Sequence, residues 1–212
     1  MFRIRDFLYV CVVKVCLISA GFASDAKVLT YDLTKDFKQY RAEVKEYILE
    51  NSKDRYGDVL SVTKEERAHV MAPFFYNNTK CQKSERVGFL LLHGMKSGPF
   101  SMLGMKDSIL RVFPCSMILI PIMSGHGSIL GNAVQAKYED WVVSTVNSFK
   151  YLSLHTGKQV VVGHSIGGVL SLELMRQGLL DATDKLILTA PVLKFKNRIG
   201  AFFGVNVLDE FG

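Results

Sequence analysis

Residues 159–168, QVVVGHSIGG, are the segment of the chain most informative about its fold. The apolar run within residues 159–162 is typical of a strand buried on both faces. Residues 166–176, which begin within this segment and continue past it, have helical character. Ser165 lies where the two meet, in the pattern Gly163-x-Ser165-x-Gly167. A serine on a tight strand-to-helix turn needs glycine neighbours, because larger side chains would collide across the turn. The sequence therefore predicts that Ser165 is a nucleophile. The alternative is a serine N-cap between glycines that serve packing alone.

The sequence on both sides of this stretch alternates between buried strands and amphipathic helices. Apolar runs predict strands, and apolar residues at spacings of three and four predict helices. Strands are expected at residues 87–92, 116–122, 159–162 and 184–188, and helices at 138–154 and 166–176, with a further helix opened by residues 97–99. This order predicts an α/β domain over residues 87–212, with a mostly parallel sheet and flanking helices.

A second loop supports the prediction of a hydrolytic site. His93, Gly94 and Met95 directly follow the predicted strand at 87–92. An oxyanion hole needs two backbone donors near one oxygen, and the N–H groups of Met95 and Ile166 are the natural candidates. Gly94 would let the loop bend toward the nucleophile. Because an oxyanion hole uses backbone N–H groups, the His93 ring is not needed for it. We expect this ring to bond to the loop backbone and to take no part in the reaction.

Four segments together resemble the α/β-hydrolase family, near its monoacylglycerol lipase and carboxylesterase branch. They are Leu90-Leu91-Leu92-His93-Gly94, Ser124-Gly125-His126-Gly127, Asp140-Trp141, and the elbow from Val162 to Gly168. The resemblance spans about residues 87–191 and implies the α/β-hydrolase fold. It also implies hydrolysis of a small-molecule ester or lipid through an acyl-serine at Ser165, with no cofactor. It implies a structural role for His126, and we expect His164 to point away from Ser165.

The sequence departs from the family pattern after the elbow. The family places an acid and then a histidine beyond the serine, whereas all five histidines here precede Ser165. The family's last strands are not found, so the fold is expected to be incomplete and the chain at most a feeble hydrolase. Asp209 is a candidate acid, and residues 202–207 could begin a lid or form an ordinary connector. Three explanations stay open: a truncated gene product, a piece of a longer chain, or a non-catalytic α/β-hydrolase-like binding protein.

The N-terminal part of the chain has the pattern of a targeting signal. Residues 1–23 are predicted to be a signal peptide, because positive charge precedes an apolar stretch that ends in small residues near Ala23. An uncleaved anchor helix is the alternative, although the stretch is short for a bilayer span. The first interpretation implies a secreted or periplasmic protein with no stable membrane span after signal removal. Residues 24–86 are expected to form an N-terminal helical extension, with a helix at 34–51 capped by Thr34.

Cysteine usage agrees with export. Cys11 and Cys16 lie in the predicted signal, which leaves Cys81 and Cys115 as a pair in a compartment that favours oxidation. Each precedes a predicted strand, and in the resembled fold these strands are neighbours. We therefore expect a disulfide where the two strands begin, with two separate thiols as the alternative. No other cysteine lies near either one, so no metal site is expected.

Composition argues for a globular domain and against a nucleic-acid partner. Hydrophobic residues make up 49% and charged residues 22% of the chain, which is ordinary for a folded domain. The net charge is +6, but it is diffuse, and the densest basic cluster contains only Lys194, Lys196 and Arg198. A nucleic-acid site would need a larger basic surface with aromatic or motif support.

Overall fold

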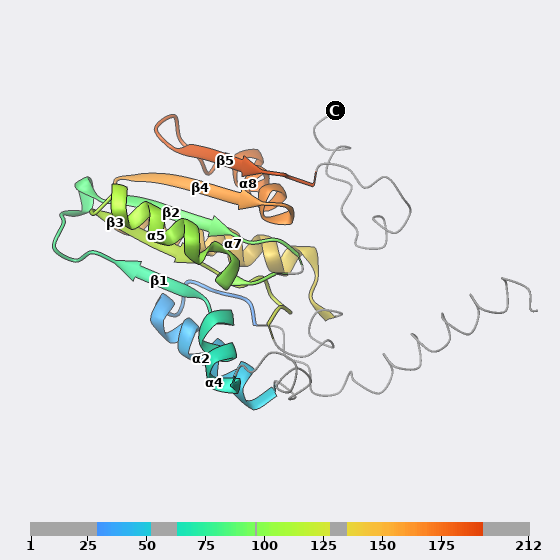
Figure 1. Ribbon diagram of the computed structural model, residues 1–212. Helices are drawn as coiled ribbons and strands as arrows, with labels where there is room; N and C mark the ends of the chain where they lie inside the picture. Colours follow the sequence, from blue (N-terminus) through green and yellow to red (C-terminus); the bar gives the residue numbers. More distant parts are fainter. Residues whose placement is uncertain (1–28, 52–62, 96, 128–134, 193–212) are drawn as a thin grey trace, which may run out of the picture.

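The computed structural model describes residues 29–51, 63–95, 97–127 and 135–192 of the chain. At its centre lies a five-stranded sheet in the order β1-β3-β2-β4-β5 (Figure 1). The strands are β1 (Phe74–Asn77), β2 (Val87–Leu92), β3 (Ser116–Ile120), β4 (Lys158–His164) and β5 (Lys185–Thr189). β2 to β5 pair in parallel, and β1 pairs antiparallel with β3. The predicted α/β class with a mostly parallel sheet is confirmed.

The predicted strands are present, with small differences at their ends. β2 begins and ends where the sequence predicts, whereas β3 ends at Ile120, two residues early. β4 continues past the apolar run to His164, because its backbone still pairs there with Thr189 of β5. A strand ends where its ladder of backbone hydrogen bonds ends, and the apolar side chains mark only its buried part.

Helices cover both faces of the sheet. α7 (Tyr138–His155) and α8 (Ile166–Arg176) lie on one face, while the 3₁₀ turn η2 (Pro99–Met102) and α5 (Leu103–Val112) lie on the other (Figure 1). The alternation of side chains along β2 produces both layers. Leu90 and Leu92 belong to the core beneath α7 and α8, whereas Phe89 and Leu91 belong to the core beneath α5.

The N-terminal segment contributes more than the expected helix. α2 (Phe37–Asn51) packs into the same core as α7 and α8, and it is followed by α4 (Lys64–Met71), β1 and the short turn η1 (Lys83–Glu85). The sequence predicts a helical extension at 24–86 and a hydrolase core from residue 87 onward. β1 lies within the predicted extension, yet it belongs to the same sheet as the strands of the core. This strand has only four residues, too few to show a strand pattern in the sequence.

Asp36, and not Thr34, caps the start of α2. The Asp36 carboxylate accepts the backbone N–H groups of Lys38 and, at 3.1 Å, Gln39. The N–H of Thr34 donates instead to the carboxylate of Asp32 at 2.9 Å, in a turn that precedes the helix. Both residue types cap helices well, so the path of the chain into α2 decides which one does so.

Cys81 and Cys115 form a disulfide, with their Cα atoms 5.7 Å apart. The bridge lies where β2 and β3 begin, since the N–H of Val87 donates to the Cys115 carbonyl at 3.0 Å. It therefore fixes the spacing of the two strands at their first residues.

No helix within the described ranges is long and apolar enough to cross a membrane. Several sequence predictions fall on residues outside the described ranges: the signal peptide at 1–23, the basic cluster at 194–198, the segment at 202–207, and Asp209.

Candidate active site

Ser165 is the single residue between the end of β4 and the start of α8. Its backbone has φ 57° and ψ −119°, a conformation that strains a residue with a side chain by roughly 1–3 kcal/mol. The Ser165 N–H donates to the Thr189 carbonyl at 3.0 Å, and the Ser165 carbonyl accepts the Gly168 N–H at 3.0 Å. Ser165 therefore lies on the strained strand-to-helix turn that the sequence predicts, and hydrogen bonds to β5 and α8 hold it there.

Glycines let the elbow pack tightly against the sheet. A Cβ atom on Gly163 would lie 2.4 Å from the Gly167 carbonyl oxygen, and one on Gly167 would lie 2.3 Å from the Leu92 carbonyl oxygen. A Cβ atom on Gly168 would lie 2.9 Å from the Pro191 side chain. The first two contacts involve backbone, which cannot move aside cheaply, so Gly163 and Gly167 are required for this turn.

The register of the sheet brings the loop after β2 beside the elbow. β2 and β4 pair so that Leu92 lies opposite Gly163, and residues 93–95 leave the sheet next to Ser165. A Cβ atom on Gly94 would lie only 3.4 Å from the Cβ of Ser165. The loop and the elbow are thus in direct contact, as the sequence predicts.

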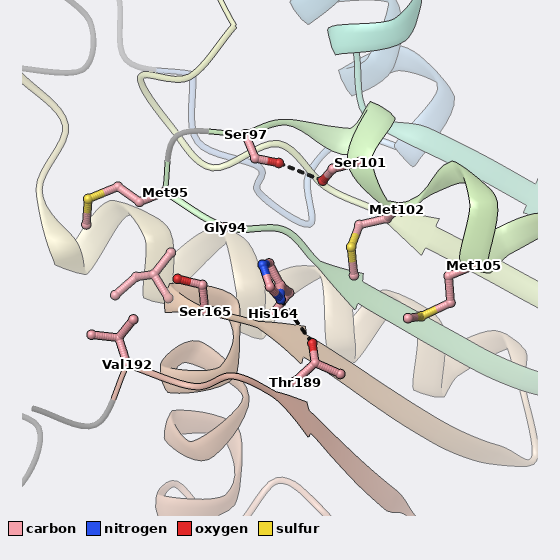
Figure 2. A pocket seen from close by; sticks show the side chains of 11 residues that line it. Gly94, Met95, Ser97, Ser101, Met102, Met105, His164, Ser165, Thr189 and Val192 are labelled. Atoms are coloured by element: carbon pink, nitrogen blue, oxygen red, sulfur yellow. Dashed lines mark hydrogen bonds between the residues drawn. The ribbon is translucent and has the colours of Figure 1, made fainter.

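A cavity of about 610 Å³ opens beside Ser165 (Figure 2). Met95 and Ile166, whose N–H groups are the predicted oxyanion donors, lie on its wall with Ser165. The rest of the wall comes from the loop after β2, η2, α5, the last residues of β4 and β5, and the segment after β5. It consists of Gly94, Ser97, Ser101, Met102, Met105, His164, Thr189 and Val192. Most of the surface that this wall exposes is apolar, and serine, threonine and histidine side chains add polar groups, which is typical of a site for an apolar ligand.

Sequence reasoning did not predict all of these residues. Met102 and Met105 showed only the helical spacing of a buried face, and such spacing cannot tell a core from a cavity wall. His164 points away from the Ser165 hydroxyl, as expected, yet it lines the same cavity (Figure 2). Its Nδ1 lies 3.2 Å from the hydroxyl oxygen of Thr189.

The buried ring of His93 joins the loops that follow β2 and β3. Its Nε2 accepts the N–H of Met123 at 3.1 Å, so Nδ1 carries the hydrogen and donates to the Gly94 carbonyl at 2.8 Å. Burial lowers the pKa of His93 to about 3, and the ring is neutral at physiological pH. As expected, this histidine bonds to the loop backbone.

His126 approaches the loop after β2 from the loop after β3. Its Nε2 is hydrogen-bonded to the Met95 carbonyl, and Nε2 must carry the hydrogen because a carbonyl only accepts. The ring packs edge-on against the rings of His93 and Trp141, with centroids 5.4 Å and 5.8 Å away. Burial lowers the pKa of His126 below its ordinary value, which favours the neutral ring.

In the described part of the chain, no histidine is hydrogen-bonded to the Ser165 hydroxyl. His93 and His126 bond to the backbone of the loop after β2. His155 bonds to a carbonyl within α7, and His164 to a threonine.

The described residues also contain no group of three or more histidine, cysteine or acidic side chains that could hold a metal ion. The described residues of the site are the strained strand-to-helix turn at Ser165, the loop at 93–95 beside it, and the cavity.

The chain is similar in sequence to a known lipase. No family model matches it. The thermostable monoacylglycerol lipase of Bacillus sp. (strain H-257) is 30% identical over 88 residues. The match covers 42% of this chain and 34% of that lipase, so it spans about a third of the relative's length.

The fold is also similar to that of solved structures. The fold resembles a structure reported for LipS and LipT, two metagenome-derived lipolytic enzymes, with a TM-score of 0.54 and 19% identity over 64% of this chain and 52% of that chain. An esterase from Exiguobacterium antarcticum has a TM-score of 0.44 and 18% identity, covering 61% and 44% of the two chains. The first likeness and the elbow define the class: the chain has the α/β-hydrolase fold. Within this class, the chain resembles lipases and esterases, as the sequence segments indicate.

Proposed function

We propose that the protein is a serine hydrolase that cleaves carboxylic esters through an acyl-serine intermediate. The observation that supports this most directly is the strained elbow at Ser165, which opens into an apolar cavity beside the loop at 93–95. A structural serine has no need of this conformation, and strain of this kind is found at functional sites.

In the proposed reaction, the Ser165 oxygen attacks the ester carbonyl carbon while its proton passes to a base. The carbonyl oxygen takes up negative charge, and the N–H groups of Met95 and Ile166 donate to it. The tetrahedral intermediate then expels the alcohol, which takes a proton, and leaves an acyl group on Ser165. Water attacks this acyl-serine in the same manner and releases the carboxylic acid.

The cavity favours an ester with an apolar acyl part. Met102 and Met105 form a flexible apolar wall close to Ser165, and methionine adapts well to chains of different shape. Small-molecule esters and lipids are therefore the proposed substrates, and this chemistry needs no cofactor.

The second candidate is a binding protein that retains the elbow without catalysis. It is favoured by one observation: among the described residues no histidine is hydrogen-bonded to Ser165. A serine hydroxyl without a base is a poor nucleophile at neutral pH.

Labelling of the whole chain with a fluorophosphonate probe separates the two candidates. We expect the wild-type protein to be labelled at Ser165 and Ser165→Ala to show only background labelling, because the variant lacks the oxygen that attacks the phosphorus of the probe. Ser108→Ala is the matched control, because Ser108 is an exposed serine on α5. Equal labelling of the wild type and Ser165→Ala would favour the binding protein.

We also propose that the protein is secreted or periplasmic, with cleavage near Ala23. The Cys81–Cys115 disulfide supports this location, because such bonds persist in oxidising compartments. Mass measurement of protein from its native host should give an N-terminus near Ser24, and an intact Met1 would contradict the proposal.

A further inference from the structure

We propose that His126 is a positioning residue of the oxyanion hole, which holds the Met95 carbonyl so that the Met95 N–H keeps its direction. The inference rests on the proposed function and concerns the same site. Together with His93, the ring would fix the backbone on both sides of the Met95 Cα atom.

His93 fixes the first of two peptide groups. The Gly94 carbonyl and the Met95 N–H belong to one planar trans peptide, and they point in opposite directions. Because His93 Nδ1 holds that carbonyl at 2.8 Å, the Met95 N–H points away from the buried ring. The hydrogen bond to the carbonyl also polarises the peptide and strengthens its N–H as a donor.

His126 fixes the next carbonyl along the chain. Its Nε2–H donates to the Met95 carbonyl oxygen. With the carbonyls of Gly94 and Met95 both held, Met95 has little freedom to rotate about its own φ and ψ. A donor that is already aimed at the developing charge needs no reorganisation in the transition state, and this is the source of its catalytic effect.

The His126 ring is itself held in place. Its backbone N–H donates to the Met123 carbonyl at 3.0 Å, and the ring lies edge-on against His93 and Trp141. The indole N–H of Trp141 donates at 2.8 Å to the Ser124 carbonyl, which ties the same loop to α7. The ring thus connects a rigid helix to the oxyanion loop without touching the Ser165 hydroxyl.

Two variants separate the hydrogen bond from the packing. His126→Phe keeps a ring of similar size without the N–H, and His126→Gln supplies an amide N–H in its place. His155→Phe is the matched control, because His155 also packs on an aromatic ring but lies at the far end of α7. For each variant we would measure the labelling rate at saturating fluorophosphonate and the probe concentration that gives half that rate.

We expect His126→Phe to lower the saturating rate about tenfold or more while the half-saturating concentration changes less than about threefold. His126→Gln should recover most of the rate, and His155→Phe should match the wild type. A wild-type rate in His126→Phe would overturn the inference, as would equal losses in the Phe and Gln variants.

Hydrogen exchange of the peptide that contains residues 93–97 tests the inference independently of labelling. The Ser97 N–H donates to the Gly94 carbonyl at 3.2 Å, and we expect this amide to exchange faster in His126→Phe than in the wild type, His126→Gln or His155→Phe. Unchanged exchange would overturn the positioning role. A wild-type protein that does not label, but shows this exchange pattern, would refute the proposed function alone.

Discussion

The two ends of the parallel sheet are held by different forces. At the amino end, where the strands begin, the Cys81–Cys115 disulfide joins the segments before β2 and β3, and Arg86 Nε donates to the Cys81 carbonyl at 2.9 Å. At the carboxyl end, a strained serine and two buried or partly buried histidines hold the loops through hydrogen bonds to the backbone.

The two ends of the sheet therefore contribute to different properties: the disulfide end to the stability of the fold, and the Ser165 end to the proposed reaction. A covalent bridge acts mainly by restricting the unfolded chain, and it places no demand on the geometry of a distant site. Strained backbone acts in the folded state, where it costs stability. The hydrogen-bonded rings of His93 and His126 also act there, because they hold the loop beside the cavity. We therefore expect changes at the amino end to alter unfolding without altering labelling, and changes at the carboxyl end to alter labelling.

Loss of the disulfide should have the largest effect on stability. The bridge closes a loop with a sequence separation of 34, for which the chain-entropy estimate is about 4 kcal/mol. We expect the double variant Cys81→Ser, Cys115→Ser to lose about this much free energy of unfolding in urea titrations. Its Ser165 labelling rate should stay at the wild-type value at a temperature where it is folded.

Reduction of the wild-type protein is the control for this experiment, since a reductant should lower its stability but leave the double variant unchanged. A tenfold loss of labelling in the folded double variant would show that the two ends of the sheet are coupled.

Gly167→Ala should affect both stability and labelling. The new Cβ atom would lie 2.3 Å from the Leu92 carbonyl oxygen, and we expect a loss of about 3 kcal/mol in the free energy of unfolding. Displacement of the elbow from the oxyanion loop should lower labelling about 100-fold or more.

Gly104→Ala on α5 is the matched control, because nothing lies within 4 Å of a Cβ atom at that position. This variant should gain up to about 1 kcal/mol, since alanine favours a helix. Equal stability of the two alanine variants would contradict the packing described at the elbow.

His93 should make the folded protein sensitive to mild acid. Burial lowers its pKa to about 3, whereas in the unfolded chain the ring takes up a proton near pH 6.5. Below that pH the unfolded state binds more protons, so the free energy of unfolding should fall by about 1.4 kcal/mol per pH unit as the pH decreases. His126, whose pKa is also lowered, acts in the same direction.

Urea unfolding between pH 7 and pH 5 would measure this slope before most carboxylates titrate. His93→Asn should show a clearly smaller slope, and the cysteine double variant should keep the wild-type slope. A wild-type slope in His93→Asn would mean that other groups cause the acid sensitivity.

The smallest expected effect is a pH-dependent change in the fluorescence of Trp141. Trp141 is the one tryptophan of the chain, and its ring contacts His126. Because a protonated imidazole quenches a neighbouring indole, Trp141 fluorescence should fall as His126 titrates. Burial lowers the pKa of His126, so the midpoint should lie below 6.5. The transition should vanish in His126→Phe and persist in His155→Phe; a transition retained in His126→Phe would contradict the assignment.

The alternation of strands and helices and the elbow at Ser165 can be read from the chain without its three-dimensional structure. These features are local: an apolar run, a helical spacing, and glycines two residues on either side of Ser165 act within a few positions of the chain. β2 and α8 accordingly begin and end where their patterns predict. α4 is not predicted from the sequence, although the capping box formed by Thr63 and Glu66 is also a local signal. This helix is short and rich in charged residues, so its apolar residues show no clear helical spacing.

Contacts between residues far apart in the chain depend on the folded arrangement of the strands. β1 is too short to be recognised alone and is stabilised by pairing with β3, whose residues lie 40 to 46 positions later in the chain. The contact between His126 and the Met95 carbonyl spans 31 positions, and it exists because the loops after β3 and β2 leave neighbouring strands at the same end of the sheet. Met102, Met105 and Val192 line one cavity for the same reason. Local patterns encode how a segment folds, but strand order and register determine what lies opposite it, and these depend on the free energy of the whole core.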